Sequence, residues 1–244
     1  MRHASGARVA VIGAGWAGLA AAVEATTGGH AVTLFEMAPT VGGRARSVAG
    51  SAGAGSGFSP DDLPFDNGQH ILIGAYRETL RLMDQVGAST ERVLLRAPLA
   101  LVDADGVGLR LPTGWPTLAF ARGVCAHGSW TAGERCALLW AATGWAAARF
   151  RCSAALSVEA LCAGLPQAVQ RDLIEPLCVA ALNTPAAEAS AQIFLSVVRD
   201  ALFSGPGSAD LLLPRRPLGE LLPEPALRWL TERGAPVHTS HRVN

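Results

Sequence analysis

Charged residues are scarce in this 244-residue chain, at 16% of the sequence, and lysine is absent altogether. Soluble domains carry about 25% charged residues, so the low charge content favours an apolar ligand or a partner surface. All 20 basic side chains are arginine, which we interpret as a compositional bias of the genome and not as function. Acidic side chains also number 20, so the formal net charge is zero and nothing in this balance indicates nucleic acid as a partner.

Long apolar runs are also lacking. No stretch of about 18 residues, the length that a membrane-spanning helix needs, is both apolar and free of charge. The nearest run, 136–148, lies between Arg135 and Arg149 and predicts a buried or interfacial helix. Arginines before the first apolar run imitate a secretory signal, but the glycine spacing explains that run better. The N-terminus is therefore predicted to belong to the mature protein.

The five cysteines are odd in number and widely spaced, and they form no C-x-x-C pair. Such a pattern is not typical of a disulfide framework or of a zinc site. We therefore predict no metal site, and buried thiols in a reducing cytoplasm.

The N-terminal stretch contains a glycine-rich motif between a strand and a helix. Residues 9–12 form a short apolar run that predicts a buried parallel strand. Gly13, Gly15 and Gly18 follow in the spacing G-x-G-x-x-G, and 19–25 predict an alanine-rich helix. The first glycine permits a tight turn, the second lets the backbone approach a pyrophosphate, and the third lets the helix pack on the strand. Alone the motif is weak, because such turns arise by chance in a chain with 27 glycines.

Two later features strengthen the prediction of a dinucleotide site. A second apolar strand is predicted over 31–35 and ends at Glu36, 18 residues after Gly18, where a carboxylate can accept hydrogen bonds from ribose hydroxyls. An acidic residue there suits an unphosphorylated ribose and argues against NADP. A Gly-Gly-Arg sequence follows, in which the bare backbone at Gly43 and the guanidinium of Arg44 can meet the pyrophosphate or the flavin edge. The alternative for this segment is a loop with a solvated arginine.

A third stretch, FDNGQHILIG, packs polar, small and apolar residues more tightly than a plain strand requires. One interpretation places Gly68, Gln69 and His70 beside a flavin ring, where glycine allows close approach and the polar side chains can hydrogen-bond ring heteroatoms or substrate. The alternative is a turn capped by Asp66 and Asn67 with a structural histidine, and the residues alone leave both interpretations open.

Beyond residue 75, the sequence predicts a mainly helical region followed by short return strands. The apolar helix predicted over 131–151 carries two tryptophans and is more typical of a core, but it could line a lipid pocket. Residues 112–129 are predicted to be irregular. The other predicted elements are helices over 75–86, 158–162, 167–179, 187–203 and 217–233, the last broken near Pro223 and Pro225, a hairpin over 99–111, and strands over 210–213 and 236–239.

The composite of G-x-G-x-x-G, an acidic strand end and G-G-R-A-R-S resembles the FAD-binding N-terminus of the amine oxidase and phytoene desaturase superfamily of flavoproteins. NAD-dependent dehydrogenases share the first half but not normally the Gly-Gly-Arg continuation, so FAD is the predicted cofactor. Later blocks resemble the hydroxysqualene dehydroxylases, also named squalene-associated FAD-dependent desaturases. These blocks are 65–83, 177–185, 189–203 and 210–230, and the similarity runs through essentially the whole chain.

The resemblance implies an α/β fold, with a Rossmann-like FAD-binding domain that is discontinuous in sequence and an inserted α+β substrate domain. Residues 1–75 would form the first segment of the FAD-binding domain and 76–208 a largely helical substrate or cap region, while 209–244 would return towards the FAD domain. Members of the superfamily normally close the flavin site with a second FAD motif near the C-terminus. The C-terminal part is therefore expected to be missing here.

The resemblance also implies a reaction, the reduction of hydroxysqualene to squalene by reduced FAD with loss of water, in hopanoid biosynthesis. Hydride must reach the allylic carbon as the C–O bond breaks, so the protein would supply a long apolar cavity and one proton donor. His70 is the first candidate donor, Asp66 the second and His127 a distant third, and a purely structural role for His70 stays open. The residues predicted to contact FAD are Gly13, Gly15, Gly18, Glu36, Gly43, Arg44, Gly68 and Gln69.

Three other interpretations stay open. The nearest is a carotenoid or phytoene-type desaturase, which uses the same fold and cofactor in the oxidative direction on another polyisoprenoid. The second is a chain without catalytic activity, as a fragment or a partner protein. The third, an NAD-dependent dehydrogenase, is disfavoured by the Gly-Gly-Arg sequence that ends at Arg44.

The predicted substrate also bears on location. A lipophilic polyisoprenoid partitions into bilayers, so we expect a cytoplasmic protein in peripheral contact with the inner face of the cytoplasmic membrane. The tryptophan-bearing region 112–150 is the predicted contact. The sequence carries no signal for an oligomeric state.

Overall fold

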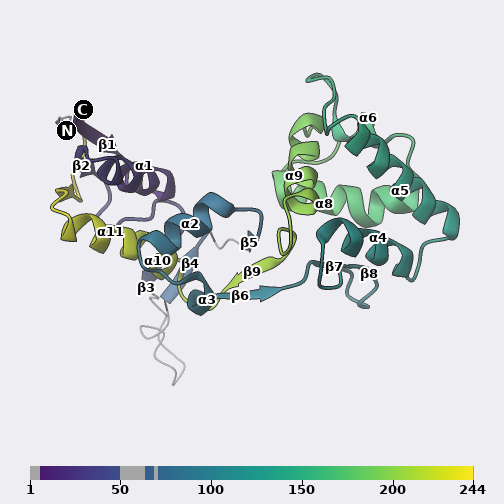
Figure 1. Cartoon of the computed structure of the whole chain (residues 1–244), viewed down its shortest axis with the longest axis horizontal. Coiled ribbons are helices and arrows are strands. Elements are labelled where there is room, and N and C mark those ends of the chain that lie inside the picture. Colours follow the sequence, from purple (N-terminus) through teal and green to yellow (C-terminus); the bar gives the residue numbers. More distant parts are fainter. Residues whose placement is uncertain (1–5, 50–63, 69–70, 244) are drawn as a thin grey trace, which may run out of the picture. The chain divides into compact units, whose positions relative to one another are not determined.

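The protein, described by a computed structural model over residues 6–49, 64–68 and 71–243, divides into two compact units (Figure 1). Unit 1 comprises Met1–Leu72, Tyr76–Leu95 and Leu212–Asn244, and unit 2 comprises Ile73–Ala75 and Arg96–Leu211. The structure thus places 76–95 with the N-terminal segment, whereas the sequence analysis assigned them to the cap region. The division of the chain by function stays a prediction.

Unit 1 contains a three-stranded parallel sheet, whose strands β1 (Arg8–Ile12) and β2 (Ala31–Phe35) are labelled in Figure 1. The third strand is β10 (Val237–His238), and the strand order is β1-β2-β10. Helix α1 (Trp16–Thr27) connects β1 to β2 and packs beside α11 (Pro223–Glu232). In β2 the buried Val32 and Leu34 alternate with less buried residues, as a strand with one packed face requires. The predicted Rossmann-like strand-helix-strand unit is confirmed.

Smaller elements complete unit 1. They are the antiparallel pair β3 (Arg46–Ala49) and β4 (Pro64–Asn67), with α2 (Arg77–Gln85), α3 (Thr90–Val93) and α10 (Leu218–Leu221). The helix predicted over 217–233, with a break near Pro223 and Pro225, is divided there into α10 and α11, and both prolines fall in the first turn of α11. Proline is tolerated there, since its missing N–H has no partner inside the helix.

Unit 2 is mainly helical (Figure 1). The prediction that 112–129 is irregular is wrong, because Pro116 stands at the first position of a helix that continues to Ala126. Among the described residues, no helix is both long and apolar enough to cross a membrane. The elements are the hairpin β7 (Ala100–Val102) and β8 (Gly108–Arg110), then α4 (Pro116–Ala126), α5 (Ala132–Ala147), α6 (Val158–Cys162), α7 (Gln167–Val169), the π-helix η2 (Gln170–Ile174), α8 (Glu175–Leu182) and α9 (Ala191–Phe203).

Helix α5 begins with a capping box, in which Thr131 accepts from the Glu134 N–H and the Glu134 carboxylate accepts from the Thr131 N–H. It ends four residues before the predicted Arg151. The chain turns there because Arg149 and Phe150 adopt φ values of 54° and 56°, which lie in the left-handed region.

The π-helical segment has a cause in the sequence. Pro176 has no N–H to donate to the carbonyl of Asp172 four residues earlier, and its ring crowds that position. The turn widens over Gln170–Ile174 and the helix then continues into α8. This bulge helps to set how Leu173 and Ile174 face the interior of unit 2, where both are buried.

Two of the five cysteines contradict the prediction of buried thiols. Cys125 and Cys136 are exposed on the outer sides of α4 and α5, whereas Cys162 and Cys178 are buried. Burial raises the pKa of the Cys162 thiol to about 12, so this side chain behaves as a small apolar group.

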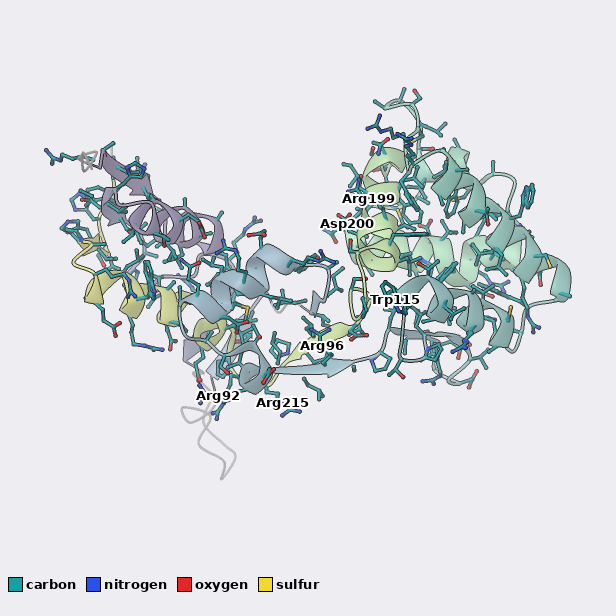
Figure 2. All side chains as sticks on the ribbon, in the orientation of Figure 1. Arg92, Arg96, Trp115, Arg199, Asp200 and Arg215 are labelled. Carbon is teal, nitrogen blue, oxygen red and sulfur yellow. The ribbon has the colours of Figure 1, made fainter. Side chains whose placement is uncertain are left out.

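Three short strands lie where the chain passes between the units. They are β5 (Leu72–Ile73), β6 (Leu94–Ala97) and β9 (Leu211–Pro214), and they form a sheet in the order β5-β9-β6. Within unit 2, Arg96 (Figure 2) donates to the Gly207 carbonyl at 3.1 Å and to the Asp210 carboxylate at 3.0 Å. These bonds tie the segment that enters unit 2 to the segment that leaves it.

Candidate functional site

The glycine-rich turn has the geometry that the motif predicts. Gly13 adopts φ +97°, a conformation that other residues rarely adopt. A Cβ on Gly18 would lie 1.8 Å from the Gly13 carbonyl oxygen, so only glycine lets α1 pack this closely on the turn. Gly15 is the N-cap of α1 and forms no side-chain cap. The first-turn N–H groups of α1 are therefore available to an anion.

Glu36, at the end of β2, forms a hydrogen bond with this turn. Its Oε2 accepts from the Ala14 N–H at 2.6 Å and its Oε1 accepts from the Ala38 N–H at 2.8 Å. A carboxylate has about four acceptor positions, so capacity remains for ribose hydroxyls. The structure thus gives Glu36 a positioning contact that the sequence analysis did not anticipate, beside the predicted ribose contact.

The Gly-Gly-Arg segment lies directly against the glycine-rich turn. The Gly42 N–H donates to the Ala14 carbonyl at 2.7 Å, and a Cβ on Gly43 would lie 3.1 Å from the Cα of Gly15. Arg44 is exposed. The two motifs, far apart in sequence, therefore form one cradle of bare backbone beside an arginine, as a pyrophosphate requires.

Arg46 was missed by the sequence analysis, although the G-G-R-A-R-S block contains it. Its Nη1 donates to Thr40 at 3.3 Å, while its buried Nε has no hydrogen-bond partner among the described residues. A Cβ on Gly42 would lie 2.9 Å from the Cβ of Arg46, so this guanidinium stem borders the cradle. An orphaned buried donor beside the cradle fits an anionic group.

The third predicted segment also reaches the cradle. Gly68 adopts φ +72°, and a Cβ there would lie 2.9 Å from the Arg44 carbonyl oxygen, so close approach requires glycine. Gln69 and His70 lie outside the described residues, and their roles stay predictions.

Asp66 accepts hydrogen bonds from two groups of unit 1. Its Oδ1 accepts from the Ser47 hydroxyl at 2.7 Å and from the Leu218 N–H at 2.9 Å, at the start of α10. The Ser47 oxygen accepts in turn from the Gly219 N–H at 3.1 Å. Asp66 therefore joins β4 to a helix from the C-terminal part of the chain, and its role as a proton donor stays a prediction.

We expect Asp66→Ala to lower the free energy of unfolding by about 1–3 kcal/mol, because it leaves two donors, the Ser47 hydroxyl and the Leu218 N–H, without an acceptor. Asp66→Asn retains an Oδ1 acceptor and should recover most of this loss. Urea denaturation of the three proteins measures the difference. Equal stability of Asp66→Ala and the wild type would show that this contact is not stabilising.

His127, the third candidate donor, is a core residue of unit 2. Its side chain is buried, and its ring stacks on Trp130 with centroids 3.8 Å apart at 11°. The Trp130 indole donates to Asp172 at 3.1 Å, and Arg135 donates to the His127 carbonyl at 2.6 Å. Burial lowers the pKa of His127. These surroundings are typical of a structural histidine.

We expect the stability of the protein to fall as the pH drops below about 6.5, the ordinary histidine pKa. Because burial lowers the folded-state pKa of His127, its contribution is fully present above the unfolded pKa and is lost progressively below it. His127→Phe keeps a stacked ring that does not titrate, so urea denaturation between about pH 7 and 5 should show a weaker pH dependence. An identical dependence in both proteins would exclude His127 as its source.

Unit 2 contains an apolar cavity of about 310 Å³ that is partly open to solvent. None of the described residues that line it is charged. The two hydroxyl groups in the lining already form hydrogen bonds within the protein. Thr117 donates to the Leu202 carbonyl and Thr143 to the Leu139 carbonyl, each at 2.7 Å. The aromatic side chains in the lining are Phe120, Trp145, Phe150, Phe194 and Phe203.

The aromatic lining is mutually packed. Phe150 and Phe203 have ring centroids 4.8 Å apart, and Trp145 meets Phe194 edge to face at 6.3 Å. The sequence analysis raised a lipid pocket for the tryptophan-bearing helix, and Trp145 does line the cavity. The rest of the lining comes from residues between Leu99 and Phe203, which no single sequence pattern connects.

Residues 16–244 match the family described as flavin-containing amine oxidoreductases. The chain is 31% identical to a hydroxysqualene dehydroxylase from Sinorhizobium fredii, over 96% of this chain and 53% of that protein. It is 33% identical to a zeta-carotene desaturase from Zea mays, over 45% of this chain and 18% of that protein. The chain thus spans about half the length of the dehydroxylase that it matches.

Solved structures agree at the level of fold. An oxidoreductase from Methanosarcina mazei superposes with a TM-score of 0.62 at 18% identity, and the match covers 96% of this chain and 51% of that one. This similarity supports the fold alone.

Proposed function

The chain belongs to the flavin-containing amine oxidoreductase family, and from that membership we propose that it acts as an FAD-dependent oxidoreductase on a long polyisoprenoid. Its specific reaction would be the reductive dehydroxylation of hydroxysqualene to squalene, as the name of the Sinorhizobium fredii relative suggests. Family membership confirms the predicted superfamily and FAD as the predicted cofactor. A cytoplasmic location with peripheral membrane contact is part of the proposal.

The observation that carries the substrate class is the cavity of unit 2. A branched hydrocarbon makes no hydrogen bonds, and the lining offers it apolar and aromatic surface whose hydroxyls are already engaged. An amine or a sugar would lose its hydration there without replacement, which costs free energy. Apolar lining with few polar groups therefore favours a polyisoprenoid over a polar substrate.

The residues of unit 1 fit FAD. The cradle of Gly13, Gly15 and Gly43 would hold the pyrophosphate with Arg44, and Glu36 would take the ribose hydroxyls. Reduced FAD, when bound, would supply the hydride that replaces the hydroxyl group of the allylic alcohol. The hydroxyl oxygen leaves as water after gaining one proton, for which His70 is the first proposed donor and Asp66 the second.

A second candidate function is desaturation of a carotenoid, since the Zea mays relative is a zeta-carotene desaturase. Product analysis separates the two. The purified chain is incubated anaerobically with FAD, a chemical reductant and hydroxysqualene, or aerobically with FAD and zeta-carotene. Squalene in the first reaction and no change in the second supports the dehydroxylase. Formation of a desaturated carotenoid without squalene would reject the dehydroxylase in favour of the desaturase.

A further inference from the structure

Helix α5 is apolar on nearly all sides. Its charged residues, Glu134 and Arg135, lie in its first turns, and none follows from Cys136 to Ala148. Helices that are apolar all round are normally buried. Leu138 is buried accordingly, at 1% exposure, but Trp140 on the opposite side is 81% exposed. The exposed residues of this side, here called the α5 outer face, are Cys136, Trp140, Thr143, Gly144 and Ala147.

Charges of both signs lie near the start of α5, whereas two exposed arginines, Arg149 and Arg151, follow its end. Near the start, Asp172 and Arg171 act on Glu134 and offset each other in charge. The carboxylate of Glu134 is engaged in the capping box at the start of α5.

The inner side of the same helix lines the cavity. Leu139, Ala142 and Ala146 contribute to the lining from α5. Thr143 belongs to both sides, because it lines the cavity and is exposed. A single helix therefore separates the apolar interior of unit 2 from the α5 outer face.

We propose that the α5 outer face docks on the surface of an anionic lipid bilayer, with Trp140 at the interface and the neighbouring arginines on the headgroups. Tryptophan favours the boundary between the hydrocarbon and the headgroups, and arginines near it are attracted to anionic lipid. The exposed Arg149 and Arg151 favour this occupant over a second copy of the chain, whose arginines would repel those of the first. The proposal rests on the proposed function, because a polyisoprenoid is stored in bilayers and docking would bring it beside the cavity.

Vesicle binding of the full chain tests this proposal. Sedimentation with phosphatidylglycerol vesicles should recover more protein than sedimentation with phosphatidylcholine vesicles. Trp140→Glu should lower the partition coefficient by about tenfold or more, since it places a negative charge on the face that would enter the lipid. The matched control is Ile193→Glu on α9, a residue that is 56% exposed in the same unit, and it should bind as the wild type does.

The arginines and the depth of the tryptophan can be tested separately. Arg149→Gln and Arg151→Gln should each weaken binding about fivefold at low ionic strength, with little effect on neutral vesicles. The contribution of Trp140 to the fluorescence is the difference between the wild type and Trp140→Phe. Brominated lipids in the vesicles should quench this difference. No quenching in that difference would overturn the docking of Trp140.

Equal binding of Trp140→Glu and the wild type would overturn the proposal, as would an equal loss in Ile193→Glu. Self-association that Trp140→Glu abolishes, without vesicle binding, would overturn it in favour of a second copy. None of these readouts uses FAD or turnover. Vesicle binding without polyisoprenoid conversion would therefore reject the proposed function and support the docking face.

Discussion

We expect Gly18→Ala to abolish FAD binding and to lower the free energy of unfolding by about 3 kcal/mol. The added Cβ would lie 1.8 Å from the Gly13 carbonyl oxygen, a distance that no packed pair of atoms tolerates. Helix α1 must therefore move away from the turn, and the pyrophosphate cradle opens. Calorimetric titration with FAD and urea denaturation measure the two effects.

Gly144→Ala is the matched control for that substitution. A Cβ on Gly144 meets nothing within 4 Å, and the residue lies inside α5. Alanine there should raise stability by about 0.5–1 kcal/mol and leave FAD affinity unchanged. Undiminished FAD affinity in Gly18→Ala would separate this turn from the cofactor site.

We expect Ala146→Phe to fill the apolar cavity and to lower the affinity for a soluble isoprenoid such as farnesol by more than about tenfold. Ala146 lines the cavity, so the phenyl ring enters the space that the ligand would occupy. FAD affinity should not change, because the predicted FAD contacts lie in unit 1. Overpacking costs about 1–3 kcal/mol of stability, which urea denaturation records beside a fluorescence competition assay with farnesol.

The adjacent substitution Ala147→Phe provides its control. Ala147 is exposed on the α5 outer face and does not line the cavity. It adds the same ring to the same helix, so farnesol affinity should stay near that of the wild type. An equal loss of farnesol affinity in both variants, or unchanged affinity in both, would reject the cavity as the isoprenoid site.

The glycine-rich turn could be predicted from sequence because it is a local motif, and its role in binding the cofactor stays a prediction. Gly13, Gly18 and Glu36 lie in one strand-helix-strand unit, whose geometry fixes the turn and the strand ends. The tertiary ties could not be predicted, since they join distant segments. Asp66 and Leu218 are 152 residues apart, and nothing in either segment specifies the other.

The helical unit shows a different limit of sequence reasoning. Pro116 breaks the periodicity of 112–129, yet it begins α4, because proline is as suitable at the first helical position as it is unsuitable inside a helix. The cavity depends on how α4, α5, α8 and α9 pack together. Apolar periodicity predicts that Trp145 and Phe194 are turned inward, but it does not predict that space remains between them.

Retention of FAD by the purified chain tests the central claim most directly. The chain is incubated with FAD and desalted, and its visible absorption spectrum is recorded with its far-ultraviolet circular dichroism. The account predicts flavin absorption at about one FAD per chain, because the cradle and its arginines lie within one compact unit. A folded but colourless protein would contradict the assignment of this cradle as a sufficient FAD site.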